Sequence, residues 1–352
     1  MRLNQALFSV LFLLSLNLLI SCSEDTTEPQ AGDVIIVNEG NFGQGNGSLS
    51  LYNRETDNIE NGSFAKANSG RSLEAGVQSV TVADGIAFIV CNVSDKIEIA
   101  DATTLEALQA PLEDPDLVSP RYLTASGNKA YVSVWGPFDA NFALTDSKVA
   151  VIDLSDYSIS KYISVPAGPE GILVIGDQVF VANSFTNVLT VIDTDTDEIS
   201  SEIILDGSPR LLSVRGNELW VSITGAVSQF VRINSSSNSI EQTIDVTGSN
   251  SNGKFSLSES HDMDILYFIG AEPFPSTATT ILETAINDAS SGYETLISGD
   301  NYYGLGVDPL NDDIFVGNSN AFQGEGTVLR YSSEGQLLDT YAVGLGPNGF
   351  VF

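Results

Sequence analysis

Basic residues are scarce in this sequence. Lys and Arg number 14 against 46 Asp and Glu over 352 residues, which gives a formal net charge of −32. A surface of this sign repels polyanions, so nucleic-acid binding is excluded as a main function. Hydrophobic residues make up 42% of the chain, too many for a disordered acidic tail. Composition therefore indicates a folded, acidic, turn-rich protein.

Histidine and cysteine are almost absent. The single histidine, His261, excludes a zinc site built from several histidines. Cys91 ends an apolar run and has the pattern of a buried, inert thiol. Asp193, Asp195 and Asp197 have the spacing of a calcium loop, but the sixth and twelfth positions of that loop do not match, so a hairpin turn is expected. We predict no metal site, no cofactor and no enzymatic activity.

Long apolar runs are absent except at the start of the chain. Residues 6–20 carry no charge, follow Arg2, and are too few for a comfortable membrane span. The run ends at Leu19-Ile20-Ser21-Cys22, a lipobox pattern in which the cysteine receives diacylglycerol and becomes the new N-terminus. We expect residues 1–21 to be a lipoprotein signal peptide and Cys22 to be the lipidation site. A plain secretory signal with an incidental cysteine is the alternative.

Acidic and polar residues follow Cys22 directly. Ser23-Glu24-Asp25 resembles the surface-export signal of lipoproteins in the Bacteroidota, with an ordinary hydrophilic spacer as the alternative. Residues 22–33 have no apolar period and are expected to be the lipidated cysteine with a flexible linker that reaches at most about 35–40 Å. The expected location is the outer membrane, lipid-anchored and exposed at the cell surface.

The rest of the chain repeats one unit of four short strands. The clearest copy places strands at residues 169–174, 178–183, 188–193 and 199–205, with turns between them. Four short antiparallel strands in about 40 residues are typical of one propeller blade.

The second strand of this unit recurs seven times, at intervals of about 40 to 53 residues. Its copies lie at residues 34–38, 87–92, 130–135, 179–183, 219–223, 266–270 and 314–318. Copies of the first strand lie at residues 78–80, 120–123, 169–172, 209–212, 302–305 and 347–350. The last copy has no partner after it, and the chain begins without a first strand. We therefore predict an all-β, seven-bladed β-propeller over residues 34–352, closed by pairing of the C-terminal strand with the N-terminal blade. A β-sandwich or two smaller propellers are the alternatives.

One rim of such a propeller is built where first strands begin and second strands end. Aromatic and amide side chains gather at these positions, which suits an uncharged or amphipathic ligand with a flat apolar body and polar edges. Asn187, Asn320 and Asn348 lie at similar places. Alternatively, the Asn side chains bond backbone and each Phe caps its own blade. The predicted ligand-binding residues are Asn38, Asn41, Phe42, Asn92, Arg121, Tyr122, Trp135, Phe138, Asn183, Phe185, Arg210, Phe274, Tyr302, Tyr303, Asn318 and Phe322.

Several segments resemble known propellers. Residues 179–183 with 191–193 look like the YVTN-type repeat of YncE-like propellers. Residues 37–43 with 48–52, residues 91–98, and residues 120–122 before 129–133 resemble the DUF5074 lipoproteins of Bacteroidota. That group includes surface propellers that capture cobalamin and hand it to a TonB-dependent outer-membrane transporter. The resemblance implies a non-catalytic lipoprotein that binds cobalamin or another corrinoid and has such a transporter as its partner.

Two other functions stay open from the sequence. A surface propeller can bind a protein partner or a glycan through a flat, dispersed aromatic face. A propeller lactonase or lyase would need carboxylates that converge on a metal in the channel, or a catalytic histidine.

Overall fold

The computed structural model describes residues 33–352 apart from residues 75, 248–249, 259–263, 274 and 288–291. The predicted signal peptide, Cys22 and most of the predicted linker lie outside the described residues, as do His261 and Phe274. No helix among the described residues is long and apolar enough to cross a bilayer.

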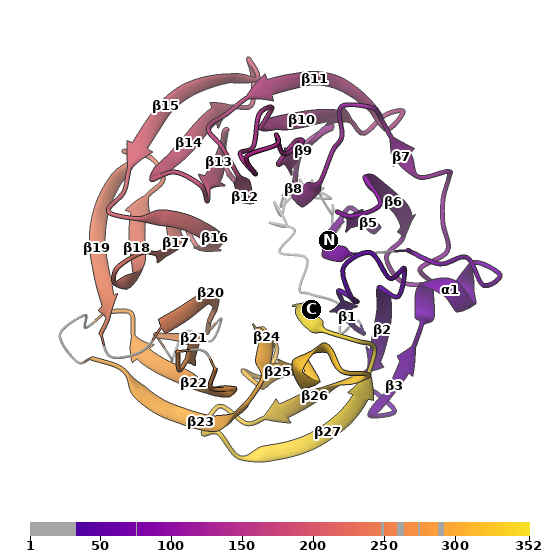
Figure 1. Ribbon diagram of the computed structural model, residues 1–352, viewed down its shortest axis with the longest axis vertical. Helices are drawn as coiled ribbons and strands as arrows, with labels where there is room; N and C mark the ends of the chain where they lie inside the picture. The colour runs from indigo at the N-terminus through magenta and orange to yellow at the C-terminus, as the bar shows by residue number, and fades with distance from the viewer. Residues whose placement is uncertain (1–32, 75, 248–249, 259–263, 274, 288–291) are drawn as a thin grey trace, which may run out of the picture. The chain divides into compact units, whose positions relative to one another are not determined.

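Seven four-stranded antiparallel sheets stand in a ring around one central axis, which we call the channel (Figure 1). From the channel outward, their strands are, in blade 1, β28 (Pro347–Val351), β1 (Val34–Asn38), β2 (Ser48–Asn53) and β3 (Asn58–Asn61); in blade 2, β4 (Val77–Ala83), β5 (Ile86–Cys91), β6 (Lys96–Asp101) and β7 (Leu112–Glu113); in blade 3, β8 (Pro120–Ser126), β9 (Lys129–Val134), β10 (Lys148–Asp153) and β11 (Ser158–Ser164).

The other four blades follow the same order. They are, in blade 4, β12 (Pro169–Ile175), β13 (Gln178–Asn183), β14 (Val188–Asp193) and β15 (Glu198–Ile204); in blade 5, β16 (Ser208–Arg215), β17 (Glu218–Thr224), β18 (Ser228–Asn234) and β19 (Ser239–Val246); in blade 6, β20 (Asn250–Leu257), β21 (Ile265–Ala271), β22 (Ala278–Ala285) and β23 (Glu294–Asp300); in blade 7, β24 (Tyr302–Val307), β25 (Ile314–Asn318), β26 (Gly326–Tyr331) and β27 (Leu337–Val343). Two short helices, α1 (Ser63–Ala67) and the 3₁₀ helix η1 (Asn320–Phe322), lie in connections.

The ring closes as the sequence predicts. The C-terminal strand β28 pairs antiparallel with β1, with Val37 opposite Gly349, and becomes the innermost strand of blade 1. All seven predicted second strands are the second strands of their sheets. The first strand of blade 6, β20, is the one that the repeat did not reveal.

Burial explains why the second strands carried the repeat. Every residue of β5 except its first is buried, and β9 and β13 have the same pattern. These strands are covered on both faces by neighbouring blades, so both faces need apolar side chains and the alternation of a half-exposed strand is lost. One core cluster, for example, joins Phe88 of blade 2 to Val132 and Ala150 of blade 3. The outermost strands, such as β15, are mostly exposed.

Candidate functional site: the channel mouth and its rim

A small cavity of about 120 Å³ lies at one mouth of the channel. All seven innermost strands contribute to it, and one further residue, Glu39, directly follows the second strand β1. Its lining residues are Glu39, Gln78, Arg121, Tyr122, Glu170, Arg210, Leu211, Asn252, Lys254, Tyr303 and Asn348. We call this cavity the channel mouth.

A β-bulge near the start of each innermost strand supplies the lining. In β8, Pro120 pairs with Val134 and Leu123 with Val132, so Arg121 and Tyr122 together oppose Ser133. A register shift occurs at the matching place in the other six blades, with one extra residue in five of them and two in β20. A bulge leaves a residue out of the ladder and re-aims its side chain. The repeat therefore fixes where the lining side chains stand, while their chemistry differs from blade to blade.

Serine hydroxyls form hydrogen bonds with the backbone of two of these bulges. The Tyr122 N–H donates to Ser133 Oγ at 3.0 Å, and Ser133 Oγ donates to the Glu170 carbonyl of the next blade at 2.6 Å. In blade 5, the Leu211 N–H donates to Ser222 Oγ at 3.0 Å. The unpaired backbone groups of the bulge are thus satisfied, as buried polar groups require.

Arg121 and Glu170 form a buried ion pair across blades 3 and 4. Arg121 Nε and Nη2 donate to the two Glu170 oxygens at 3.0 and 2.8 Å, and Glu170 is 3% exposed. Burial opposes the charged guanidinium, but the charge and hydrogen bonds of Glu170 outweigh it, and the pKa of Arg121 lies above its usual value. Two hydrogen bonds therefore hold the Arg121 guanidinium against Glu170, and the formal charges of the two side chains offset each other.

Further hydrogen bonds connect lining residues to one another and to Asn92. Asn92 Nδ2 donates to Gln78 Oε1, and Gln78 Nε2 donates to the Tyr122 hydroxyl, each at 3.2 Å. The Tyr303 hydroxyl donates to Glu39 Oε2. Burial, then the charge of Glu39, raises the pKa of Tyr303 above its usual range, so the phenol stays protonated.

An aromatic cluster stands beside the mouth on blades 3 and 4. The Arg121 guanidinium lies 4.2 Å from the Trp135 ring centroid, and Trp135 meets Phe138 and Phe185 edge to face at 6.1 and 5.4 Å. Phe138 is 46% and Phe185 52% exposed, so this cluster presents apolar area to solvent. A second aromatic pair, Tyr303 with Phe322 at 5.1 Å, borders the mouth at blade 7.

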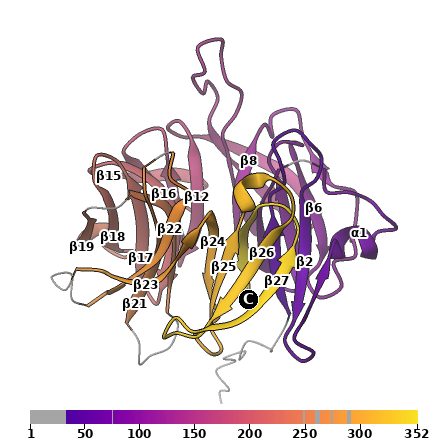
Figure 2. The same cartoon turned by 60° about the horizontal axis from the view of Figure 1, so that its bottom comes forward.

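A long hairpin carries part of this cluster. The connection from β9 to β10 includes a bridge between Phe138 and Leu144, and Figure 2 shows this loop rising above the ends of the strands. Phe142 in this loop is 84% exposed with φ at +61°, a backbone conformation that is uncommon for a bulky residue. Phe42, in the connection from β1 to β2, is 87% exposed.

The structure thus brings together many of the predicted ligand residues. Arg121, Tyr122, Arg210 and Tyr303 line the mouth. Around them lie Asn92, Trp135, Phe138, Phe185 and Phe322.

Other predicted ligand residues serve the fold. Asn38 and Asn183 have no exposed area: Asn38 Nδ2 donates to Ser50 Oγ, and Asn183 Nδ2 donates to Thr190 Oγ1, each at 2.9 Å. Tyr302 is 6% exposed and belongs to a core cluster, and Asn318 donates to the Asp300 carbonyl at 2.8 Å. We leave these four out of the candidate site.

Three of the predicted residues have neither outcome: Asn41, Phe42, whose side chain is 87% exposed, and Phe274. Asn41 is half-buried, and its backbone N–H donates to Asn46 Oδ1 at 2.7 Å. Phe274 is outside the described residues, so its role stays a prediction.

Seven lining residues were not among the predicted ligand residues: Glu39, Gln78, Glu170, Leu211, Asn252, Lys254 and Asn348. One signal could have found some of them. The dipeptide Pro-X lies at the first or second position of four innermost strands, at Pro120, Pro169, Pro209 and Pro347, and X lines the mouth in each case. The remaining blades lack this proline, so position along the repeat is all they share.

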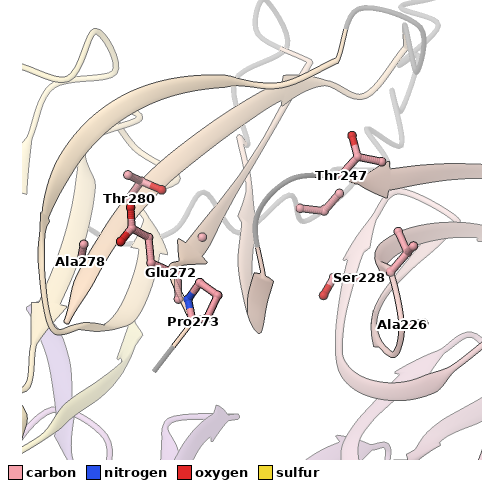
Figure 3. Close-up of a pocket in the computed structure, with 11 residues that line it drawn as sticks. Ala226, Ser228, Thr247, Glu272, Pro273, Ala278 and Thr280 are labelled. Atoms are coloured by element: carbon pink, nitrogen blue, oxygen red, sulfur yellow. The ribbon is translucent and has the colours of Figure 1, made fainter. Parts of the chain in front are cut away.

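A larger cleft of about 450 Å³ lies between blades 5 and 6. Figure 3 shows Ala226, Ser228 and Thr247 of blade 5 facing the blade 6 side, where Glu272 and Thr280 lie. Its lining is mostly small, aliphatic or hydroxylic, with one carboxylate on Glu272, and the predicted ligand residue Phe274 directly follows its Pro273 in the sequence.

Groups that could carry chemistry are few. Among the described residues, no group of three or more His, Cys, Asp or Glu is placed to hold a metal ion. Burial raises the pKa of Cys91 to about 12, so its thiol stays protonated. Asp193 Oδ1 accepts the Thr196 N–H at 2.9 Å, and the segment forms the expected turn between β14 and β15.

Comparison with known proteins gives a family and a fold. The family model described as "Domain of unknown function (DUF5074)" matches residues 32–350. No curated protein matches the chain.

Several solved structures share the fold. A quinonprotein alcohol dehydrogenase-like protein from Bacteroides thetaiotaomicron is 13% identical, with a TM-score of 0.67 over 92% of this chain and 78% of that one. A functionally unknown protein from Desulfotomaculum acetoxidans is 12% identical, with a TM-score of 0.62 over 91% and 98%. Hydrazine synthase of Kuenenia stuttgartiensis is 18% identical, with a TM-score of 0.60 over 77% and 87%. At these identities the likeness concerns the fold alone.

Proposed function

Because the chain belongs to the DUF5074 family, we propose that it is a non-catalytic capture protein of the outer-membrane surface, anchored by lipid on Cys22. It binds a small amphipathic nutrient on the face that holds the channel mouth. The first candidate ligand is cobalamin or another corrinoid. The bound ligand is then passed to a TonB-dependent transporter.

The observation that carries this proposal is the aromatic cluster of Trp135, Phe138 and Phe185 beside the channel mouth, which we call the Trp135 cluster. Trp135 is held between Arg121, whose own position is fixed by Glu170, and the rings of Phe138 and Phe185. Aromatic rings provide contact area at low entropic cost, and a preorganised surface avoids the cost of ordering on binding. A broad apolar macrocycle edged with amides, such as a corrin, would match aromatic faces next to hydrogen-bonding groups.

The size of the mouth limits how such a ligand can sit. Sites that enclose a whole small molecule span about 300–1,000 Å³, whereas the mouth holds about 120 Å³. The body of the ligand therefore lies outside, on the face between the Trp135 cluster and the Tyr303–Phe322 pair. Only an edge group of the ligand enters the mouth.

A protein or glycan partner is the second candidate. Phe42 and Phe142 are 87% and 84% exposed, more than a site for a small enclosed ligand requires. Aromatic residues are enriched at the centre of protein interfaces, so these two rings are candidate contacts for a partner. If the partner is the transporter, both candidates describe one route, in which the hairpin docks and the mouth delivers the ligand.

Calorimetric titration of the lipid-free protein, residues 24 to 352, with cyanocobalamin tests the proposal. We expect one-to-one binding that weakens at least about tenfold, or about 1.4 kcal/mol, in Trp135→Ala. Leu337→Ala is the matched control, because Leu337 is an exposed apolar residue of the outermost strand β27. No heat at high micromolar ligand would overturn the corrinoid assignment. Pull-down of the transporter from outer membranes would then test the second candidate.

A further inference from the structure

Arg210 is a cation of the channel mouth that has no ionic partner among the described residues. It stands in the bulge of β16 and lines the cavity, and no hydrogen bond or ion pair joins its guanidinium to any described residue. Its stem lies against Gly253 of β20, where an added Cβ would be 3.4 Å from the Arg210 Cβ. Gly253 has φ at +86°, a conformation that favours glycine, so this close packing is built into the strand.

Lys254 follows Gly253 on the same strand. Its Nζ donates to the Asn348 backbone carbonyl at 2.8 Å, so the side chain reaches from blade 6 to blade 1. Asn252 Oδ1 accepts the Lys254 backbone N–H at 2.9 Å and fixes the turn that places it. An ammonium has three N–H donors, so two remain after the bond to Asn348.

The carboxylates of the mouth are engaged elsewhere. Both Glu170 oxygens accept from Arg121, and Glu39 accepts from Tyr303. The mouth holds three cations and two carboxylates, so it carries one net positive charge in a chain whose formal charge is −32. The excess positive charge belongs to the Arg210 and Lys254 side of the mouth.

The acidic surface does not cancel this local charge. Strands in a sheet are about 4.8 Å apart, so an outermost strand lies roughly 14 Å from the innermost one. That separation exceeds the Debye length of about 8 Å at physiological ionic strength. Exposed acids such as Glu198 and Glu202 of β15 are therefore largely screened from the mouth.

Asn348 adds a hydrogen-bond acceptor beside the donors of Arg210 and Lys254. It lines the mouth, is 3% exposed, and its Nδ2 donates to the Gln78 carbonyl at 3.2 Å. Its Oδ1 is buried and accepts no hydrogen bond from a described residue. A buried acceptor left unpaired in this way is costly and favours a ligand that brings a donor.

We propose that Arg210 and Lys254 form a subsite for an oxyanion, either a carboxylate or a phosphate, at the edge of the captured ligand. A group that also carries a hydroxyl or N–H would match Asn348. The subsite deepens the proposed function and rests on it for the identity of the whole ligand. Its affinity for a small anion can be measured without that ligand.

Arginine NMR tests the subsite directly. The full chain, purified in detergent with ¹⁵N-labelled arginine, is titrated with sodium phosphate and separately with sodium acetate, at constant ionic strength against chloride. We expect one Nε–H signal, missing in Arg210→Gln, to shift saturably. A shift with phosphate alone assigns a phosphate group, and one with acetate alone assigns a carboxylate. No saturable shift with either anion overturns the proposal.

Variants separate this inference from the capture function. By calorimetry, Arg210→Gln should weaken binding of the effective anion at least tenfold and Arg210→Lys less. Arg232→Gln is the control, since Arg232 pairs with Glu218 away from the mouth, and should have no effect. Equal cyanocobalamin affinity in wild type and Arg210→Gln would show that the subsite does not contribute to corrinoid binding. The proposed capture function would be retained. Anion binding without any cyanocobalamin binding would retain the subsite and overturn the corrinoid.

Discussion

At the scale of single residues, the Arg121–Glu170 pair determines whether the mouth keeps its shape. Its two hydrogen bonds and the Trp135 ring leave the guanidinium with little freedom. Buried ion pairs add little net stability over apolar replacements. Loss of one partner, however, leaves the other charge buried and unpaired. We interpret this pair as a device for positioning Trp135 rather than for stabilising the propeller.

Glu170→Gln tests that interpretation. We expect the free energy of unfolding to fall by about 3 kcal/mol or more, because Arg121 would remain charged and buried without its counterion. The double variant Arg121→Met with Glu170→Leu should be more stable than the single variant, since it leaves no unpaired buried charge. Chemical denaturation followed by fluorescence measures both. A single-variant loss of about 0.5 kcal/mol, typical of surface positions, would contradict the buried pair.

At the scale of the elements, the closing strand β28 depends on glycines in blade 7. A Cβ at Gly304 would lie 2.7 Å from the Pro347 carbonyl oxygen, and glycines at 317 and 326 also crowd Pro347. Small residues here let β24, β25 and β26 approach β28 closely. Because Asn348 follows Pro347 and lines the mouth, the seating of β28 also sets one wall of the site.

Gly304→Ala should therefore lower stability by about 1–3 kcal/mol, the usual cost of overpacking a well-packed core. Gly225→Ala is the control, because a Cβ there meets nothing closer than 3.6 Å. Thermal unfolding gives the comparison. If both variants melt at the same temperature, β28 is not held by this close contact.

The same elements explain which parts of the fold and of the site could be predicted from the sequence. Second strands such as β5 and β13 are buried on both faces, so their apolar runs repeat and predict the seven blades. The strand β20 begins with polar residues and Gly253 because they form its bulge at the mouth, and it has no proline, so the repeat does not detect it. Lining residues share a position but no chemistry. Which aromatic side chains meet, as Trp135 and Phe185 do, depends on packing between blades.

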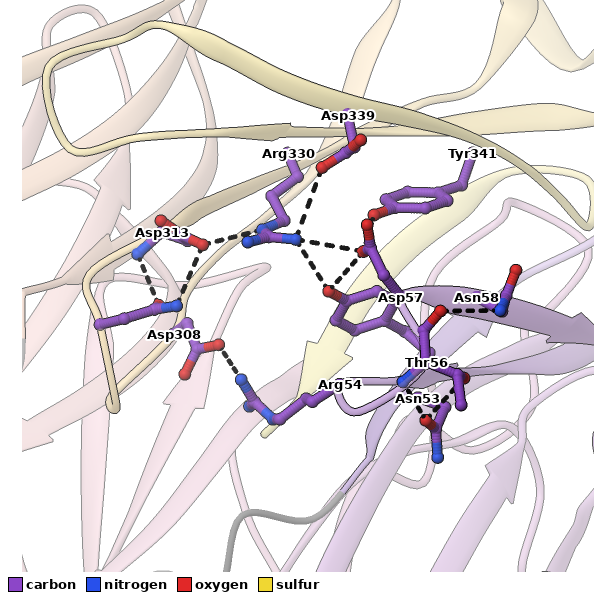
Figure 4. A network of polar contacts seen from close by, with 12 residues as sticks. Asn53, Arg54, Thr56, Asp57, Asn58, Asp308, Asp313, Arg330, Asp339 and Tyr341 are labelled. Atoms are coloured by element: carbon purple, nitrogen blue, oxygen red, sulfur yellow. Dashed lines mark hydrogen bonds and ion pairs between the residues drawn. The ribbon is translucent and has the colours of Figure 1, made fainter.

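At the scale of the whole molecule, a polar network joins the two blades where the ring closes. Figure 4 shows Arg330 of β26 meeting Asp313 and Asp339 within blade 7 and Asp57 of blade 1. Asp57 Oδ1 also accepts from the hydroxyls of Tyr52, at 2.9 Å, and Tyr341, at 2.5 Å. Arg54 of blade 1 pairs with Asp308 of blade 7. These contacts add to the β1–β28 pairing and the apolar cluster around Phe315.

The network makes ring closure dependent on pH. The hydrogen bonds from Tyr341 and Tyr52, with a smaller effect of Arg330, hold the pKa of Asp57 below its usual value. A carboxyl with a lowered folded-state pKa contributes stability above its unfolded-state pKa and loses it as pH falls through the folded-state value. The Asp57 side chain is 53% exposed, so screening limits the contribution to about 1 kcal/mol or less.

Asp57→Asn should accordingly reduce stability near neutral pH. The difference from wild type should stay constant down to about pH 5 and shrink toward zero as pH falls below the usual carboxyl range near 3.9. Denaturant unfolding across this pH series measures the difference. Asp339→Asn, which loses a single contact at 3.6 Å, should have a smaller effect. If the Asp57→Asn difference persists undiminished at the acid end, the ionised carboxylate is not what joins blades 1 and 7, and closure relies on β28 and the apolar cluster.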